Sequence, residues 1–173
     1  MRIPLLLSLL LPAVALAQTP PPATPAPAPA RPAPTAPARP ALTPAQQAQV
    51  QKQDQEMVAA ALKVATLVDA GRAGEVWKGA SAVARRSVTE QAFVAQLDSD
   101  RKRLGALVSR GQPVVTRVQY RAGATVPEGL YVNVSFPTRF ANSTQPVREL
   151  VSFRFDEDKV WRLAGYSVRA AAP

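Results

Sequence analysis

The chain has 173 residues, with 21 basic against 12 acidic side chains and a formal net charge of +9, and it contains neither Cys nor His. These absences exclude disulfides, thiol nucleophiles, thiolate metal sites and a Ser-His-Asp triad, and they remove the commonest general base. The basic surplus predicts anionic neighbours, such as membrane phosphates, anionic glycans or acidic protein faces.

The first 17 residues read MRIPLLLSLLLPAVALA, which is the pattern of an export signal. One Arg precedes an apolar run that is too short to span a bilayer, and small residues stand at Ala15 and Ala17 before the predicted cut. An uncleaved anchor is the alternative. We expect a mature chain from Gln18 that is periplasmic or secreted and has no transmembrane anchor. Nucleic acid is not an expected partner, because no nucleic-acid-binding motif appears.

Residues 18–43 are rich in Pro and Ala and cannot bury a core, so this segment should be a disordered linker that favours polyproline II conformers. It is interpreted either as a semi-rigid spacer or as a leader without a partner. Residues 44–173 then form a single domain of ordinary size.

Three helices are expected at the start of this domain. Thr43 can cap the first, with Pro44 at its first position and Gln46 completing a capping box, and Gly71 ends it. The second helix spans residues 74–86 and carries Trp77, a core residue or pocket wall rather than a ligand platform. The third follows Thr89 and stops at Gly105.

After Gly111 the hydrophobic period changes to two residues, which predicts four strands at 112–121, 130–140, 147–155 and 159–169. Helices followed by strands favour an α+β domain, with three N-terminal helices on one face of a four-stranded antiparallel meander. Pro137 cannot donate to a strand ladder, so a bulge or break is expected there. The predicted opposite pairs are Tyr120–Leu130, Phe140–Val147 and Phe155–Val160.

This register sends apolar side chains to one face and arginines to the other, where they could bind phosphate or carboxylate groups. A cation–π contact between Arg154 and Trp161 is also expected. A solvated face that uses Arg for solubility is the alternative. The predicted row of anion- or partner-binding residues across the sheet is Arg117, Asn133, Arg154 and Trp161, and the same face carries Arg139, Arg148 and Arg169.

Glu149 is the only carboxylate on the predicted core face, and the register sets it opposite Tyr166. One interpretation is proton transfer, because burial raises the pKa of a carboxyl group towards neutrality. The other is that Glu149 reaches solvent near a strand end and accepts a hydrogen bond from Tyr166. The acidic run at 156–158 is too short to surround a cation, and no cofactor fingerprint appears, so neither a metal nor a cofactor is expected.

Several segments resemble one family of exported bacterial proteins, the domain of unknown function 4019. These are VDAG at 68–71, Trp77, RLGAL at 103–107 and KVWRLAGY at 159–166, and the resemblance covers roughly residues 57–169. The family implies no activity and no catalytic residues. The order of helices before a curved sheet is similar to the nuclear-transport-factor-like, or cystatin-like, cone fold, which hosts both enzymes and binding modules.

The sequence therefore favours a non-enzymatic exported module that binds an envelope component or protein partner, with anionic ligands meeting its Arg-rich sheet face. The alternative is a cone-fold small-molecule pocket with isomerase-like proton transfer at Glu149 and Tyr166. A structural envelope component is a third possibility. A cavity lined by Glu149 would favour the enzyme.

Overall fold

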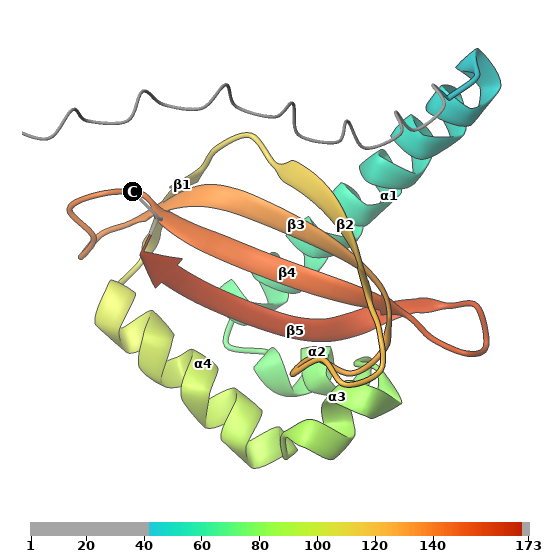
Figure 1. Cartoon of the computed structure of the whole chain (residues 1–173). Helices are drawn as coiled ribbons and strands as arrows, with labels where there is room; N and C mark the ends of the chain where they lie inside the picture. The colour runs from blue at the N-terminus through green and yellow to red at the C-terminus, as the bar shows by residue number, and fades with distance from the viewer. Residues whose placement is uncertain (1–41, 171–173) are drawn as a thin grey trace, which may run out of the picture. The chain divides into compact units, whose positions relative to one another are not determined.

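The computed structural model describes residues 42–170, so the predicted export signal and most of the predicted linker lie outside the described residues. Four helices precede five strands in this part of the chain (Figure 1). The helices are α1 (Pro44–Asp69), α2 (Ala73–Lys78), α3 (Ala82–Ser87) and α4 (Glu90–Leu104). The strands are β1 (Leu107–Arg110), β2 (Val114–Tyr120), β3 (Gly129–Phe140), β4 (Val147–Phe155) and β5 (Trp161–Ala170).

The first and last helices begin and end where the sequence predicts. The backbone N–H of Thr43 donates to Gln46 Oε1 at 2.9 Å, and the backbone N–H of Gln46 donates to Thr43 Oγ1 at 3.3 Å, which is the expected capping box. Helix α4 has Thr89 as its N-cap and Gly105 at its end. The capping residues thus fix both helices from local sequence.

The predicted single helix at 74–86 is wrong, because the chain forms two short helices there. Gly79 ends α2, and the backbone N–H of Ser81 then donates to the carbonyl of Leu163 on β5 at 2.8 Å. The hydroxyl of Ser81 accepts from the backbone N–H of Val83 and caps α3. A contact with the sheet therefore interrupts the helical pattern.

The sheet is antiparallel, with the order β1-β3-β4-β5 and with β2 also pairing with β3. Strands β1 and β2 lie end to end along the same edge of β3, and the sequence analysis missed β1. Strand β3 runs without a break through Pro137, contrary to expectation. The interruption lies instead in the neighbouring edge, between β1 and β2. There the Pro137 carbonyl accepts a hydrogen bond from the backbone N–H of Gly111 at 2.8 Å.

The first predicted register is wrong by one residue. Tyr120 pairs with Gly129 rather than Leu130, so every side chain of β2 faces the opposite way to the prediction. The ring of Tyr120 packs edge-on against Tyr131, with centroids 5.3 Å apart. Arg117 consequently points towards the polar N-terminal half of α1, where its guanidinium donates to Gln53 and Asp54.

The last register is wrong by one residue at the turn and shifts again inside the hairpin. Phe155 pairs with Trp161 rather than Val160, and a bulge between the Ser152 and Phe153 pairs adds one residue to β5. Beyond the bulge the two shifts add up to two residues, which restores the predicted facing of the side chains but not the predicted partners. Tyr166 and Val168 therefore face the core as predicted, whereas Trp161 replaces Val160 on that face.

The helices lie on one side of the sheet, with α1 crossing behind β3 and β4 (Figure 1). We call the covered side the inner face and the other side the outer face. The mixed α+β class is confirmed, although four helices and five strands are described rather than three and four. Within residues 42–170 no helix combines the length and apolar character needed to cross a membrane. The residues that join helices to sheet in the core include Met57, Ala61, Val68, Leu97, Val132, Val134, Phe136, Val151 and Phe153.

Replacing Gly129 by Ala should destabilise the domain by about 1–3 kcal/mol, the usual cost of a residue held in a sparsely populated conformation. Gly129 has φ +150°, and a Cβ there would lie 2.8 Å from Arg154 Nε. Chemical denaturation measures the loss. Gly165→Ala is the matched control in β5, since its Cβ meets nothing within 4 Å. Equal losses in the two variants would contradict this account.

Candidate functional site

Glu149 lies on the inner face of β4, opposite Phe136 and Val168, and its side chain is 0% exposed. Its carboxylate accepts hydrogen bonds from the hydroxyls of Thr138, at 2.9 Å, and Tyr166. The predicted bond from Tyr166 is therefore confirmed, while the predicted access of Glu149 to solvent is wrong. Because the shift at the turn and the bulge together move β5 by two residues, Tyr166 is a diagonal rather than a direct neighbour.

Two arginines compensate this buried charge. Arg110 on β1 donates from Nε to Glu149 Oε2 at 2.6 Å and from Nη2 to Oε1 at 2.9 Å, a bidentate pair. Arg101 on α4 donates to Oε1 at 3.1 Å and to the Tyr166 hydroxyl. Asp69, the last residue of α1, bonds Arg101 at 2.9 Å and Arg110 at 2.8 Å. The Glu149 network is Asp69, Arg101, Arg110, Thr138, Glu149 and Tyr166.

The electrostatics of this network oppose proton transfer. Burial alone would raise the pKa of the Glu149 carboxyl, but the hydrogen bonds from Arg110, Tyr166 and Thr138 outweigh it and hold the pKa below its ordinary value of 4.5. Burial and the adjacent carboxylate raise the pKa of the Tyr166 phenol well above its ordinary value of 10. A carboxylate stabilised in this way is a weak base, and the phenol is a weak acid.

Glu149 itself does not line the two pockets that border its network, one at Asp69 and Arg101 and the other at Tyr166. The pockets found on the described residues are lined by other side chains, and the space between α1 and the sheet is filled by core residues. Four side chains donate to this one carboxylate, and they come from α4, β1, β3 and β5, so the network holds these elements of the fold together.

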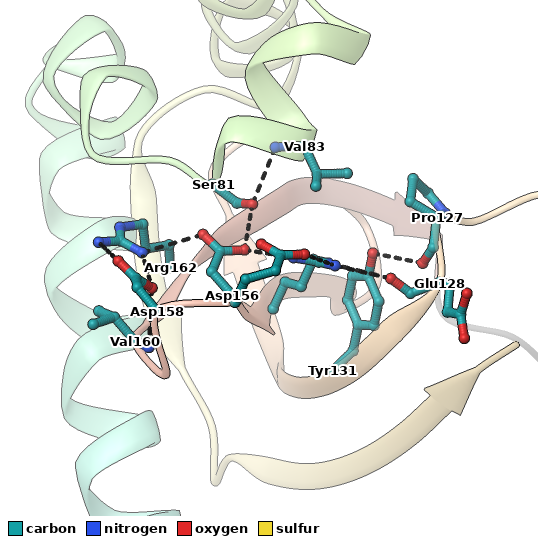
Figure 2. A network of polar contacts seen from close by, with 11 residues as sticks. Ser81, Val83, Pro127, Glu128, Tyr131, Asp156, Asp158, Val160 and Arg162 are labelled. Carbon is teal, nitrogen blue, oxygen red and sulfur yellow. Dashed lines mark hydrogen bonds and ion pairs between the residues drawn. The ribbon is translucent and has the colours of Figure 1, made fainter. Parts of the chain in front are cut away.

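A second network surrounds Asp156 in the turn between β4 and β5 (Figure 2). Asp156 accepts from the hydroxyl of Ser81 at 2.7 Å and from Arg154 Nη1 at 2.8 Å. Arg162 bridges Asp156 to Asp158, and Arg154 also reaches the carbonyl of Glu128 at 3.0 Å. The acidic turn is thus neutralised by arginines, and no cluster suited to a metal ion occurs among the described residues.

The predicted row of Arg117, Asn133, Arg154 and Trp161 is not formed. Arg117 pairs with Val132 and Arg154 with Tyr131, which places the two arginines on opposite faces. Arg117 bonds Asp54 of α1 at 2.7 Å, and Arg154 is only 7% exposed. Asn133 shares the outer face with Arg154. The one-residue error in the β2 register inverted the predicted orientation of Arg117.

Trp161 lies on the inner face instead of the outer one. Its ring packs against Phe155 with centroids 5.0 Å apart, so the expected contact with Arg154 is replaced by an aromatic pair. The cation–π contacts within residues 42–170 belong to Arg101, whose guanidinium lies 4.7 Å from the ring centroid of Phe140 and 5.8 Å from that of Tyr166.

Three other arginines gather on the outer face. Arg148 on β4 and Arg169 on β5 are directly opposite each other, and Arg139 on β3 is diagonal to Arg148 across Pro137. We call these three residues the basic corner. All three are exposed, and none has an ion pair within the part of the chain that the structure describes. Their face was predicted correctly, but the sequence did not distinguish them from the arginines of the sheet that form ion pairs, because ion pairing depends on the three-dimensional arrangement.

A shallow groove of about 480 Å³ runs beside the basic corner. Apolar side chains dominate it, and Val114 is 57% exposed. Arg148 lies at its border, so apolar and cationic groups adjoin on this surface. The groove residues are Val114, Ser135, Phe136, Pro137, Pro146, Val147 and Arg148.

Residues 60–166 match the family described as Protein of unknown function (DUF4019). The chain belongs to this family. The matched segment of the DUF4019 domain includes every residue of the Glu149 network, together with Arg139 and Arg148 of the basic corner. Comparisons with curated proteins and with solved structures gave no match.

Substituting Glu149→Gln should cost the DUF4019 domain about 3–5 kcal/mol of unfolding free energy, because it leaves two largely buried arginines with one carboxylate between them. Urea denaturation gives the value. Glu75→Gln is the matched control: Glu75 pairs with Arg72 at 2.7 Å, but both side chains are more than half exposed, so the loss should stay below about 1 kcal/mol. A small loss at Glu149 would show that the network is dispensable.

The free energy of unfolding should also fall in acid. Since the folded-state pKa of Glu149 is lowered, its contribution is complete above the unfolded value near 4.5 and is lost as the pH falls through the folded value. Denaturation at pH 7 and about pH 3 in the wild type and in Glu149→Gln separates this effect from those of other carboxylates. The variant should show a shallower acid loss, and identical slopes would refute the assignment.

Proposed function

We propose that this domain is a non-enzymatic, exported interaction module that contacts an anionic envelope component through the basic corner. The observation that supports this most strongly is how the arginines of the strands are used. Arg110, Arg117, Arg154 and Arg162 are all bound to carboxylates of the domain. Arg139, Arg148 and Arg169 are the strand arginines left over, and they lie together.

The pairing of Arg148 with Arg169 is unfavourable for folding alone. Like charges directly opposite on neighbouring strands destabilise a sheet, by a few tenths to about 1 kcal/mol. No carboxylate within the described residues bonds either side chain to offset that repulsion. A bound phosphate or carboxylate would offset it, because the planar guanidinium presents donors that match both groups.

The adjoining groove favours a lipid headgroup layer as the anionic component. Surfaces that bind membranes from one side combine basic residues with apolar ones that enter the boundary between headgroups and acyl chains. Val114, Pro137 and Pro146 supply the apolar part next to Arg148. An isolated basic patch would suit a soluble polyanion equally well, whereas this combination suits an amphiphilic surface.

The alternative of proton transfer at Glu149 and Tyr166 has no supporting observation. Both groups donate to or accept from partners within the network, and their pKa values are displaced away from neutrality. The cone fold remains part of the proposal, supported by the order of helices before a sheet with one covered face.

The test is co-sedimentation with vesicles of phosphatidylcholine, with and without phosphatidylglycerol. Wild type should bind the anionic vesicles more tightly at low salt and lose that binding as salt rises, because exposed charges are screened. Arg148→Gln combined with Arg169→Gln should reduce the binding about thirtyfold, since each charge near the surface contributes roughly 1 kcal/mol.

The matched control is Arg85→Gln combined with Arg86→Gln, which removes the same number of exposed arginines from α3. It should retain most of the binding if the corner is responsible. Equal losses of vesicle binding in both double variants would show that only the net charge of the protein matters, and would refute the proposal. Binding to soluble polyphosphate but not to vesicles would reject the membrane while keeping the anion.

A further inference from the structure

A separate apolar pocket lies between the helices and the free edge of the sheet, away from the basic corner. It has a volume of about 200 Å³, and α2, α3, α4 and β5 each contribute to its wall. Its lining residues are mainly aromatic rings and small aliphatic side chains. Residues that line it include Trp77, Ala84, Val88, Phe93, Gly165 and Tyr166.

The bulge in β5 creates the space. Leu163 pairs with Phe153 and Gly165 with Ser152, so Ala164 is the extra residue of the bulge. Two small residues therefore occupy the strand between the large inner side chains of Leu163 and Tyr166. Ala80 forms a parallel bridge to Leu163, which holds the junction of α2 and α3 against the strand just beside this gap.

The pocket wall is mostly apolar, with polar atoms contributing only a minor share of it, and the polar side-chain groups of its lining residues already have partners. The indole N–H of Trp77 donates to the carbonyl of Val88 at 3.2 Å, and the hydroxyl of Tyr166 is bound to Glu149 on the far side of its ring. Among the described residues, no charged side chain lines the pocket. Water inside such a site would find few partners, because an ordered water needs two to four of them.

We propose that this pocket binds a small, uncharged, apolar molecule of about the size of a single aromatic ring. An enclosed apolar cavity of about 150 Å³ binds benzene. The pocket here is partly open to solvent, but its volume is comparable and its wall is mostly apolar, so it suits the same class of ligand. Trp77, Phe93 and Tyr166 provide ring faces and edges that a ligand can contact. The small residues Ala84 and Gly165 leave space for it. This site is independent of the membrane contact proposed above.

The probe is toluene, added to the purified protein containing the whole domain, with benzoate as the charged counterpart of the same ring size. Toluene should raise the Tm, because it binds the folded state alone, and should shift the NMR signal of the Trp77 indole N–H. Benzoate should do neither. An unchanged Tm and indole signal with toluene, or equal binding of benzoate, would overturn the proposal.

Ala84→Leu is the blocking variant, since the larger side chain fills the space on α3. It should weaken toluene binding at least tenfold while keeping or raising the Tm of the free protein. Ala59→Leu is the matched control, an exposed position on α1 outside the pocket, and it should bind toluene like the wild type. If Ala84→Leu fails to fold, Ala84→Val replaces it, with a smaller expected loss of toluene affinity. Undiminished binding in the blocking variant would place toluene elsewhere and refute the site.

Discussion

The fold depends on one negative charge that has been taken completely out of water. Glu149 is stable inside the domain because α1, α4, β1, β3 and β5 each contribute a partner, directly or through Asp69. Two carboxylates and two guanidiniums balance in charge, so the network is neutral as a whole. Such a network contributes little net stability compared with an apolar core, but it makes any other docking of helices on sheet costly, because a misplaced element would leave a charge buried and alone.

The two networks divide the work of joining helices to sheet. The Glu149 network ties the end of α1 and α4 to the middle strands, and the Asp156 network ties Ser81, at the start of α3, to the turn between β4 and β5 (Figure 2). Arginine is suited to both tasks because its planar fork meets two oxygens at once and retains its charge when buried. Five of the thirteen arginines among the described residues serve the fold in these contacts, namely Arg101, Arg110, Arg117, Arg154 and Arg162. Only the arginines outside these networks and outside the contact of Arg117 with Asp54 remain for recognition.

The features that depend on local chemistry could be predicted from the sequence. The features that depend on the exact register between strands could not. Caps at Thr43 and Thr89, the stop at Gly105 and the inward faces of β3 and β4 follow from neighbouring residues and are confirmed. The orientation of Arg117 depends on whether Tyr120 meets Gly129 or Leu130, which the long loop between these strands leaves undetermined. The burial of Glu149 was visible in the alternation, but Arg101 and Arg110 come from elements far away in sequence, and no local pattern marks them as its partners. The basic corner became recognisable only once the other strand arginines were seen to be occupied.

The broken edge formed by β1 and β2 has a consequence for how the protein behaves in a crowded compartment. An exposed strand edge invites a second copy to add its own strand, and natural sheets defend against this with short strands, prolines and kinks. Here the edge is interrupted at Gly111–Pro113, between β1 and β2. This interruption lies opposite Pro137, which has no N–H, and β1 adds a register shift at Val108. At the opposite edge, the bridge from Ala80 occupies Leu163. Neither border is one uninterrupted ladder along its whole length, and such interruptions lower the tendency of a sheet to pair edge to edge with a second copy.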